Sequence, residues 1–235
     1  EASNKIEGIY TSDTRLKEIV QKKSEPRNRN EKEIAGYREV LGMIHDSYSY
    51  IQLKPNDILT LHKYLYSYSE SGNGGRYKMV DNYIEEEDEN GNKSVRFQPI
   101  PAVLTKKYIE DMCNRYEEVI NHTSIDPLLV IPCVILDFLC IHPFGDGNGR
   151  IGRLLTNEQL DMLGLPPIII PNKSKFDEYY PALDEYTKTN KADKLTELFA
   201  SLLIEALYRR ITKLTAKKVI PVADWAKNNG INLQS

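Results

Sequence analysis

The chain has 235 residues, of which 40% are hydrophobic and 28% charged, and its formal net charge at pH 7 is −3. This length and balance predict one large globular domain, or one domain with a small appendage. Because no excess of basic residues gives the whole molecule a positive field, the composition argues against a general nucleic-acid binder or a protein of anionic membrane surfaces.

Neither the cysteines nor the apolar stretches indicate a secreted or membrane protein. Cys113, Cys133 and Cys140 are an odd number, lack a C-x-x-C spacing and lie in apolar surroundings, as expected for reduced core residues. The longest apolar run, 128–141, is interrupted by Asp137 and is shorter than the ~20 residues that a membrane span needs. No secretory leader is recognisable, and we expect a soluble, cytoplasmic protein.

The first part of the chain predicts three amphipathic helices, over 11–23, 30–48 and 54–69. In each, apolar residues recur at helical spacing. The first range opens with Thr and Ser, which are favourable N-caps, and the third opens with Pro and Asn, as helix starts prefer.

The pattern changes over 71–101, which is rich in Gly and Asn. Apolar and polar residues alternate over 76–84 and 94–97, and Asn90-Gly91 lies between these runs. This arrangement predicts a β-hairpin. Its long tip includes the acidic run 85–89, which we interpret as a solvated charged surface, with a basic partner as the alternative.

Helices resume after the hairpin, and the predicted ranges are 101–121, 126–142, 149–164, 174–190 and 191–214. The helix over 126–142 is apolar on all sides, which predicts a central buried helix. The tail 218–235 resembles the first half of a helix-turn-helix without a recognition helix, so we do not expect nucleic-acid binding by this chain.

Residues 141–155 read IHPFGDGNGRIGRLL and form a glycine-rich loop between two predicted helices. The unpaired N–H groups and the dipole at the start of the second helix favour an anion there. Gly147 and Gly149 permit φ > 0 and close approach of the backbone to a ligand. Arg150 and Arg153 are three residues apart, so both can reach a polyphosphate.

Two further side chains complete a plausible chemistry. Asp146 would repel a neighbouring phosphate unless a divalent cation lay between them, and Mg²⁺ held by one carboxylate plus phosphates is a common arrangement. His142 ends the preceding helix, where an imidazole of pKa ~6.5 is suited to accept a proton. Each residue alone also has a structural explanation, since glycines commonly end helices and a histidine at a helix end is usually structural.

Together these residues resemble the signature of the Fic (Fic/Doc) family, H-x-F-x-[DE]-G-N-G-R-x-x-R. The match is complete, and its fixed positions are His142, Phe144, Asp146, Gly147, Asn148, Gly149, Arg150 and Arg153. With each residue type near one in twenty by average usage, eight fixed positions arise by chance on the order of once in 10¹⁰ starting points. Chance similarity is therefore excluded.

The family transfers part of a nucleotide, most often AMP from ATP, to a hydroxyl side chain of a target protein. The resemblance implies that His142 is the general base for that hydroxyl, that Asp146 holds Mg²⁺ against the α- and β-phosphates, and that Phe144 anchors the loop. It also implies a phosphate-binding segment whose members are Gly147, Asn148, Gly149, Arg150, Ile151, Gly152 and Arg153.

The resemblance extends to two regions that would border the nucleotide. Residues 74–86 look like the strand entering the family's flap, a hairpin that lays target backbone against the active site, although Lys78 stands where the family often has Arg. The implied contact residues are Asn82, Tyr83, Ile84 and Glu85. The implied adenine pocket contains Tyr179, Tyr180 and Asn190, for which a half-buried helix face and a helix C-cap are the structural alternatives.

The first residues, EASNKIEG, resemble the family's inhibitory helix motif, [ST]-x-x-x-E-[GN], through Ser3, Glu7 and Gly8. The resemblance implies that Ser3 positions the segment and that Glu7 pairs with Arg153. A frayed terminus with a capping-like serine is the alternative. We therefore expect an all-α Fic fold with one β-hairpin over 11–215, preceded by an inhibitory segment, 1–10, and followed by the tail, 216–235.

The leading hypothesis is a Mg²⁺-dependent protein adenylyltransferase that uses ATP. Its acceptor would be a Ser, Thr or Tyr hydroxyl of a target protein or of the chain itself, without a membrane partner, and the oligomeric state stays open. One alternative is another transfer seen in the family (of UMP, phosphocholine or phosphate) or the removal of AMP. A different alternative is a catalytically silent nucleotide-sensing regulator.

Overall fold

The structure is a computed structural model, and it describes residues 1–47, 50–70, 72–87, 91, 93–215, 226 and 229. The predicted helix-turn-helix start in the tail therefore lies outside the described residues, apart from those two isolated positions. The same holds for residues 88–90 of the predicted acidic tip.

Helices make up most of the described chain, and a two-stranded antiparallel sheet completes it. In chain order the elements are α1 Ala2–Ile6, α2 Asp13–Val20, α3 Arg29–Ser47, α4 Pro55–Leu65, β1 Ile84–Glu87, β2 Lys93–Phe97, α5 Ala102–His122, α6 Pro127–Ile141, α7 Asn148–Met162, the π-helical turn η2 Lys175–Tyr179, α8 Tyr180–Thr189 and α9 Asp193–Thr215. The prediction of an all-α fold with one hairpin is confirmed.

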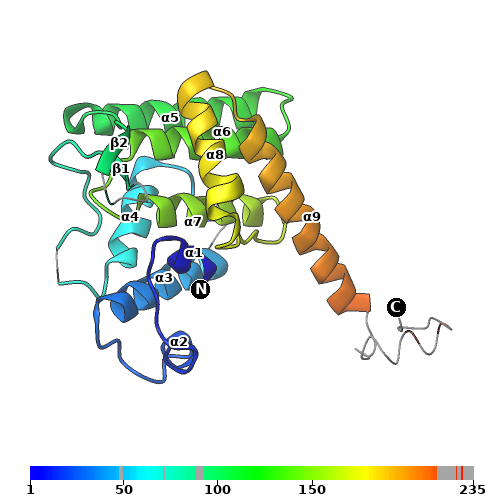
Figure 1. Ribbon diagram of the computed structural model, residues 1–235. Helices are drawn as coiled ribbons and strands as arrows, with labels where there is room; N and C mark the ends of the chain where they lie inside the picture. Colours follow the sequence, from blue (N-terminus) through cyan, green and yellow to red (C-terminus); the bar gives the residue numbers. More distant parts are fainter. Residues whose placement is uncertain are drawn as a thin grey trace.

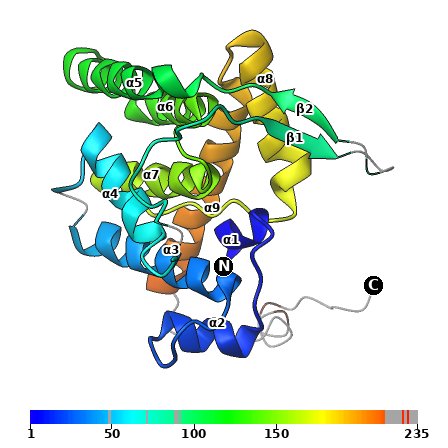
Figure 2. The ribbon, with the colours of Figure 1, turned by 90° about the vertical axis from the view of Figure 1, so that its left-hand side faces the viewer.

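The helices surround a central pair, α6 and α7 (Figures 1 and 2). Helix α6 packs against α5, α7 and α9, while α3 and α4 cover the other side of α7. The short helix α1 lies against α7, although the two are far apart in the sequence. The N-terminal segment therefore reaches the middle of the molecule.

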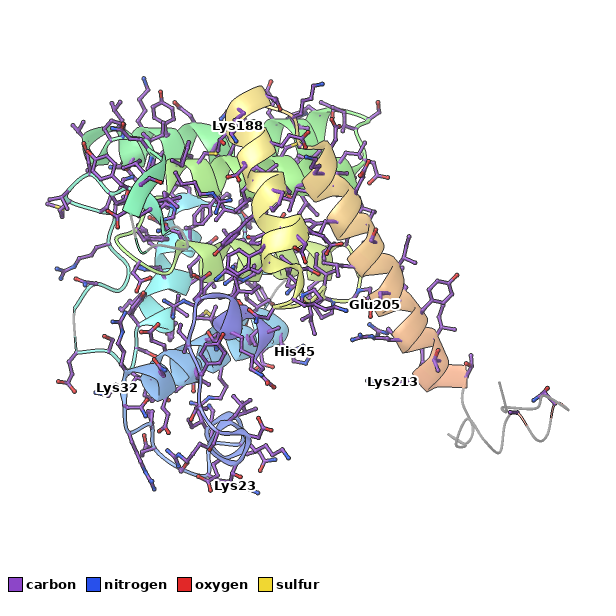
Figure 3. The ribbon with its side chains drawn as sticks, in the orientation of Figure 1. Lys23, Lys32, His45, Lys188, Glu205 and Lys213 are labelled. Atoms are coloured by element: carbon purple, nitrogen blue, oxygen red, sulfur yellow. The ribbon has the colours of Figure 1, made fainter. Side chains whose placement is uncertain are left out.

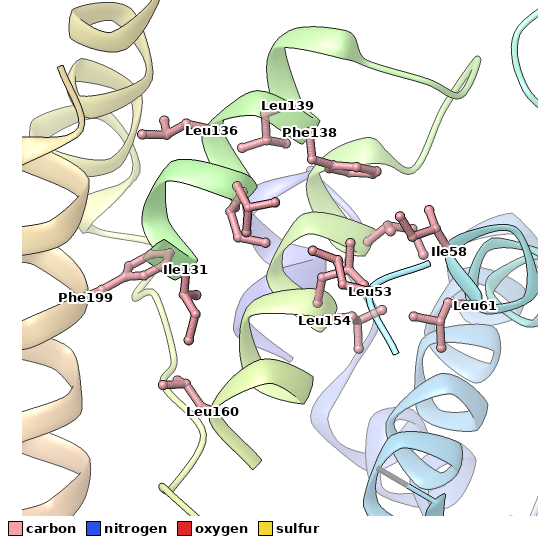
Figure 4. Close-up of a cluster of buried hydrophobic side chains, with 14 of the residues drawn as sticks. Leu53, Ile58, Leu61, Ile131, Leu136, Phe138, Leu139, Leu154, Leu160 and Phe199 are labelled. Atoms are coloured by element: carbon pink, nitrogen blue, oxygen red, sulfur yellow. The ribbon is translucent and has the colours of Figure 1, made fainter. Parts of the chain in front are cut away.

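The core is built from the apolar faces of these helices, as Figure 4 shows. Ile131 and Phe138 of α6 and Leu154 of α7 are fully or almost fully buried, and Leu61 of α4 and Phe199 of α9 close the cluster from either side. Burying one such side chain contributes about 1.5–3 kcal/mol before conformational entropy is counted. As predicted from its composition, α6 is a central helix of the core, although Leu129 in its first half is exposed.

Helices α3 and α4 cross closely, and this crossing forms one wall beside the glycine-rich loop. A Cβ atom on Gly36 of α3 would collide with the carbonyl oxygen of Leu65 in α4. Only glycine lets the two backbones approach this far. The crossing brings His62 and Tyr66, at the end of α4, beside the glycine-rich loop.

The hairpin is shorter than the sequence predicts. Its strands pair with Ile84 opposite Phe97 and Glu85 opposite Val95, with a bulge between Ile84 and Glu85. The alternating run 76–83 is not a strand, because its polar groups bond to the loop after α6 instead of to a neighbouring strand. Lys78 supplies the main bonds, to the carbonyl groups of Pro143 and Ile141.

Two further expectations need correction. The helix predicted over 174–190 is continuous but not α-helical throughout, since the π-helical turn η2 leads directly into α8, and Pro181, near the start of α8, has no N–H for an α-helical bond. Cys113 is buried and Cys140 partly buried, but Cys133 is exposed and is not a core residue. Within the described part of the chain, no helix has both the length and the apolarity to cross a membrane.

Candidate active site

The glycine-rich loop makes a tight turn between α6 and α7. Helix α6 ends at His142, which has left-handed dihedral angles (φ 50°, ψ 61°), and Gly147 (φ 85°) is the N-cap of α7. A Cβ at Gly147 would lie 3.1 Å from the side chains of Leu65 and Tyr66. Glycine is thus required there by both conformation and space.

Phe144 and Asn148 fix the shape of this loop. Phe144 is fully buried. The Asn148 amide accepts a hydrogen bond from the Phe144 N–H (2.9 Å) and donates one to the Phe144 carbonyl (2.8 Å). The Asn148 side chain is therefore occupied by the loop itself, and only its backbone N–H remains for the predicted phosphate contact.

The start of α7 leaves backbone donors of the kind that the expected anion site needs. The first bond of the helix runs from the Ile151 N–H to the Gly147 carbonyl (2.9 Å), so the N–H groups of Asn148, Gly149 and Arg150 are left for another acceptor. Of the predicted phosphate-binding residues, Ile151 and Gly152 do not face this site. Ile151 is fully buried in the core, and Gly152 packs against α6.

His142 is held in one orientation. Its backbone N–H bonds to the Phe138 carbonyl (3.0 Å) and its Nδ1 lies 3.3 Å from the Leu139 carbonyl. Since a carbonyl only accepts, Nδ1 carries the proton and Nε2 the lone pair. Burial, opposed by that hydrogen bond and aided by nearby Lys78, lowers the pKa of His142 to about 4. The ring is therefore neutral near pH 7 and can accept a proton.

Arg153 is buried and bonds to the N-terminal segment. Its Nε donates to Ser3 Oγ (2.8 Å), and its Nη2 donates to the Ser3 carbonyl (2.9 Å) and to Glu7 Oε1 (2.6 Å). The contacts implied for Ser3 and Glu7 are thus both present. The same carboxylate lies over Gly149, where an added Cβ would collide with Glu7 Oε1, so Glu7 covers the start of α7.

Arg150 points elsewhere. It is almost completely buried, its Nη1 pairs with Glu33 (2.6 Å), and its Nη2 donates to the Tyr66 hydroxyl (3.0 Å). Sequence analysis gave no sign of Glu33 or Tyr66, because both come from helices remote in the chain. In this conformation Arg150 links the start of α7 to Glu33 and Tyr66, and it does not line the pocket that Arg153 lines.

That pocket has a volume of about 330 Å³ and lies between the hairpin, α6 and α8. Its lining includes His142, Gly149 and Arg153 together with Glu7, and it also includes Tyr180 of α8. Arg96 of β2 bonds to both carboxylate oxygens of Asp184 (2.8 and 2.7 Å) and lies 4.8 Å from the centre of the Tyr180 ring. The sequence pattern did not single out either residue.

The predicted adenine-pocket residues separate in space. Tyr179 is buried and Tyr180 half-buried, and both line the pocket. Asn190 is exposed and is the left-handed C-cap of α8 (φ 57°). It lies at the opposite end of that helix from Tyr180, so the adenine-pocket expectation for Asn190 does not hold and its structural alternative does.

The predicted flap residues divide in the same way. Tyr83, Ile84 and Glu85 line the pocket. Asn82 instead bonds to the loop, since its amide donates to the Phe144 carbonyl (3.0 Å) and its oxygen accepts from Lys78 Nζ (2.8 Å).

Lys78 is the residue that ties the entry of the flap to the loop. Its N–H donates to the Pro143 carbonyl (2.8 Å) and its Nζ to the Ile141 carbonyl (3.2 Å). Burial lowers the pKa of Lys78. A residue of this position and size therefore fixes the hairpin relative to His142.

Asp146 has the features of a single carboxylate for Mg²⁺. Its side chain is 57% exposed, beside the start of α7, with Oδ1 accepting from the Gly147 N–H (2.6 Å) and Oδ2 3.6 Å from Arg29. No group of three or more His, Cys, Asp or Glu side chains suited to a metal gathers among the described residues. This donor set fits an ion that takes one protein carboxylate, phosphate oxygens and water.

Two residues that sequence analysis missed connect the parts of the site. His62 stacks on Phe144 (ring centres 3.7 Å apart), accepts from the Gly75 N–H (3.0 Å) and lies 3.1 Å from the Asp146 carbonyl. Lys175 donates to the Ile6 carbonyl at the end of α1 (2.7 Å) and lies 5.3 Å from the centre of the Tyr180 ring. Neither belongs to a local motif.

Comparison of the sequence with known proteins identifies a family that it resembles. Residues 52–160 match the model of the Fic/DOC family. Protein adenylyltransferase fic-1 of Caenorhabditis elegans is 26% identical over 132 residues, which are 56% of this chain and 24% of the relative. Protein adenylyltransferase Fic of Drosophila mojavensis is 31% identical over 134 residues, with the same two shares. The chain thus spans about a quarter of the length of these curated relatives.

Solved structures share the fold. A Fic domain containing signaling protein from Bacteroides thetaiotaomicron superposes with a TM-score of 0.79 at 22% identity, covering 94% of this chain and 87% of that one. Fic-1 from C. elegans gives a TM-score of 0.74 at 21% identity, covering 92% and 62%. The part of the chain that matches the Fic/DOC family, residues 52–160, thus contains the whole glycine-rich loop and is similar to a Fic domain.

Proposed function

We propose that the chain is a protein adenylyltransferase that transfers AMP from ATP to a Ser, Thr or Tyr hydroxyl of a target protein or of the chain itself. The observation that carries this proposal is the neutral, oriented imidazole of His142 at the end of a pocket that also contains the start of α7. The names of the curated relatives support the same activity.

The pocket suits a nucleotide bound along its length. Its aromatic wall at Tyr180 offers a surface for the base, and the free N–H groups at the start of α7 favour the phosphates. Arg153 lies at the phosphate end, where a guanidinium can bind two phosphate oxygens at once. The Mg²⁺ that Asp146 would hold, when bound, neutralises phosphate charge.

The reaction that fits these groups is an in-line displacement. The acceptor hydroxyl donates its proton to His142 Nε2 as its oxygen attacks the α-phosphorus of ATP. A new phosphorus–oxygen bond forms, the bond from the α-phosphorus to the bridging oxygen breaks, and pyrophosphate leaves. The fixed Nδ1 hydrogen bond keeps Nε2 as the basic nitrogen throughout.

Glu7 makes the described conformation an inhibited one. Its carboxylate is bonded to Arg153 and covers Gly149, so a negative charge already occupies the place proposed for the terminal phosphates. Phosphates that enter beside it are repelled and misaligned for attack. We therefore propose that ATP is turned over only when the N-terminal segment moves away from Arg153.

Intact-mass analysis of the Glu7→Gly variant tests the proposal. The variant is incubated with Mg²⁺ and each nucleoside triphosphate separately, with and without EDTA, and Glu7→Gly/His142→Ala is the matched control. A gain of one AMP from ATP, lost in the control and with EDTA, is expected. Gain of UMP identifies another transfer. Tight ATP binding without any mass gain, also on proteins of a lysate, favours the silent regulator.

A further inference from the structure

A second and larger cavity lies on the other side of the glycine-rich loop. It has a volume of about 930 Å³ and is bounded by the start of α3, the end of α4, the connection from α4 to β1, and Gly145–Asp146. The connection from α4 to β1 faces the viewer in Figure 2. We call this cavity the α3–α4 groove. Asp146, which would hold Mg²⁺ in the proposed reaction, lies at its edge, and the proposed reaction leaves the rest of the groove unused.

The cationic residues of the groove outnumber the acidic ones. Its lining contains five cations, Arg27, Arg29, Lys32, Arg76 and Lys78, and three anions, Glu33, Glu70 and Asp146. Each of the three anions already lies within 4 Å of a cation: Glu33 pairs with Arg150 and Arg29, Glu70 with Lys32, and Asp146 lies 3.6 Å from both Arg29 and Arg150.

Arg27 and Arg76 supply the surplus charge. Both side chains are exposed, and neither forms an ion pair with any residue that the structure describes. Exposed cations at a concave surface attract anionic groups more strongly than isolated ones do, because the walls focus their field. The groove is therefore complementary in charge to an acidic ligand.

Its rim is apolar as well as basic. Met79 and Val80 line the groove and are 90% and 75% exposed. Two adjacent apolar side chains left in water favour a partner that also offers apolar surface. A polypeptide with mixed acidic and apolar side chains satisfies both properties, whereas a free phosphate or pyrophosphate satisfies only the first.

The groove also leads to the proposed reaction site. Asn82 lines the groove and the next residue, Tyr83, lines the nucleotide pocket. On the loop, Asp146 faces the groove and Gly149 the pocket. We propose that the α3–α4 groove docks an acidic segment of the protein that is modified, beside the pocket where its hydroxyl reacts. This inference rests on the proposed function for the identity of its partner.

Peptide binding without nucleotide tests the groove independently of catalysis. The probe is a fluorescein-labelled peptide of Glu, Asp, Leu and Gly, and the comparison probe has Lys at every acidic position. Fluorescence anisotropy is measured with the full chain, its Arg27→Glu/Arg76→Glu variant, and Lys107→Glu/Lys188→Glu as a control of equal charge change. Lys188 lies on α8, far from the groove residue Lys32 (Figure 3).

The acidic peptide should bind the wild-type chain and should bind Arg27→Glu/Arg76→Glu about tenfold more weakly, while the control changes by less than twofold. Binding should weaken as salt rises from 50 to 200 mM, and Met79→Ser/Val80→Ser should also weaken it. If both peptides bind equally, or if Arg27→Glu/Arg76→Glu has no effect, the groove does not dock an acidic segment, even if AMP transfer is found. Effective competition by inorganic polyphosphate, with no effect of Met79→Ser/Val80→Ser, overturns the choice of a polypeptide.

Discussion

The Glu7 carboxylate and the Arg153 guanidinium are 146 residues apart in the sequence and 2.6 Å apart in the structure. Arg153 is buried, while the Glu7 side chain keeps about a third of its surface exposed. The pair is supported by Ser3, which bonds to the same guanidinium, and by Lys175, which bonds to the end of α1. A helix of only five residues is thereby held across the start of α7.

Replacement of Glu7 by glycine should raise AMP transfer by roughly one to three orders of magnitude. The change frees Arg153 for the nucleotide, and each ~1.4 kcal/mol of differential binding corresponds to a tenfold change in rate. Incorporation of labelled AMP at equal protein concentration measures the effect. Glu1→Gly is the matched control, because Glu1 is in the same segment and, among the described residues, its carboxylate pairs only with Lys5. Equal or lower incorporation by Glu7→Gly contradicts the inhibitory role.

Removal of the base should abolish transfer without abolishing ATP binding. His142→Ala in the Glu7→Gly background should lose about 10²–10⁴ in rate, the usual contribution of a general base. The ATP dissociation constant, measured by calorimetry, should change by less than threefold, because the ring does not hold the phosphates. Transfer at the parental rate means that His142 is not the base.

The pH dependence of transfer follows from the same residue. With the pKa of His142 at about 4, the base is neutral at higher pH and becomes protonated as the pH falls through that value. The kcat/KM of Glu7→Gly should therefore be flat between pH 6 and 8 and fall toward pH 4. A midpoint near 6.5, the ordinary value for histidine, is inconsistent with the burial that we describe.

Tyr180 should contribute to ATP binding more than to turnover. Its ring forms part of the pocket wall and contacts the Arg96 guanidinium. Tyr180→Ala should raise the KM for ATP about tenfold and change kcat by less than threefold, because the lost contact is made equally before and during reaction. Tyr208→Ala, an exposed position on α9, is the control. If only kcat falls, Tyr180 acts in the chemical step and not in binding the adenine base of ATP.

His62 should be required for the position of the loop. His62→Phe keeps a ring against Phe144 but removes the hydrogen bonds to Gly75 and Asp146. Leaving those partly buried backbone groups unpaired should cost on the order of 1–3 kcal/mol of unfolding free energy. Transfer should fall with it, since small displacements of reacting groups are expensive. Chemical denaturation measures the cost, and His122→Phe, at an exposed position, should show none.

A buried carboxyl in α7 gives a separate test of the core. Glu158 is fully buried and accepts from the Gln159 amide, while its Oε1 has no hydrogen-bond partner among the described residues. Burial, with Asp57 and Asp161 nearby, raises its pKa to about 8. The folded state thus binds this proton more tightly than the unfolded state, so stability is lost as pH rises from 4.5 through 8.

Glu158→Gln removes the titration and should stabilise the protein at high pH. Its advantage in unfolding free energy should be near zero at pH 4.5 and reach on the order of 2–4 kcal/mol at pH 8.5. Guanidinium unfolding at pH 4.5, 6.5 and 8.5 gives the difference. Glu118→Gln on the exposed face of α5 is the control. If the difference in unfolding free energy is the same at all three pH values, the pKa of Glu158 is not raised.

The positions of the elements were largely predictable because local interactions set them. Asp126 caps α6 through its own side chain, 2.8 Å from the Leu128 N–H, and Gly147 supplies the left-handed residue before α7. Such signals act over a few residues and survive any tertiary arrangement. The apolar sequence of 126–142 likewise predicted a central helix, and residues 134–141 are all buried or partly buried, whereas Leu128, Leu129 and Cys133 in its first half are exposed.

The sequence by itself also determined the chemical content of the loop between α6 and α7. It could not determine what each side chain faces. Arg150 and Arg153 belong to one motif, yet Arg150 pairs with Glu33 and Arg153 with Glu7. Those partners come from other helices, and only the packing of α1 and α3 against α7 brings them close.

Only the tertiary structure decided which backbone groups found partners inside the molecule. The alternating run 76–83 has the pattern of a strand, but Lys78 bonds to Pro143 and Ile141 and Asn82 bonds to Phe144. Buried polar groups must be paired, and the loop supplied partners that no second strand could. The hairpin thus begins only at Ile84, where its chain leaves the loop and the polar backbone again needs a neighbouring strand.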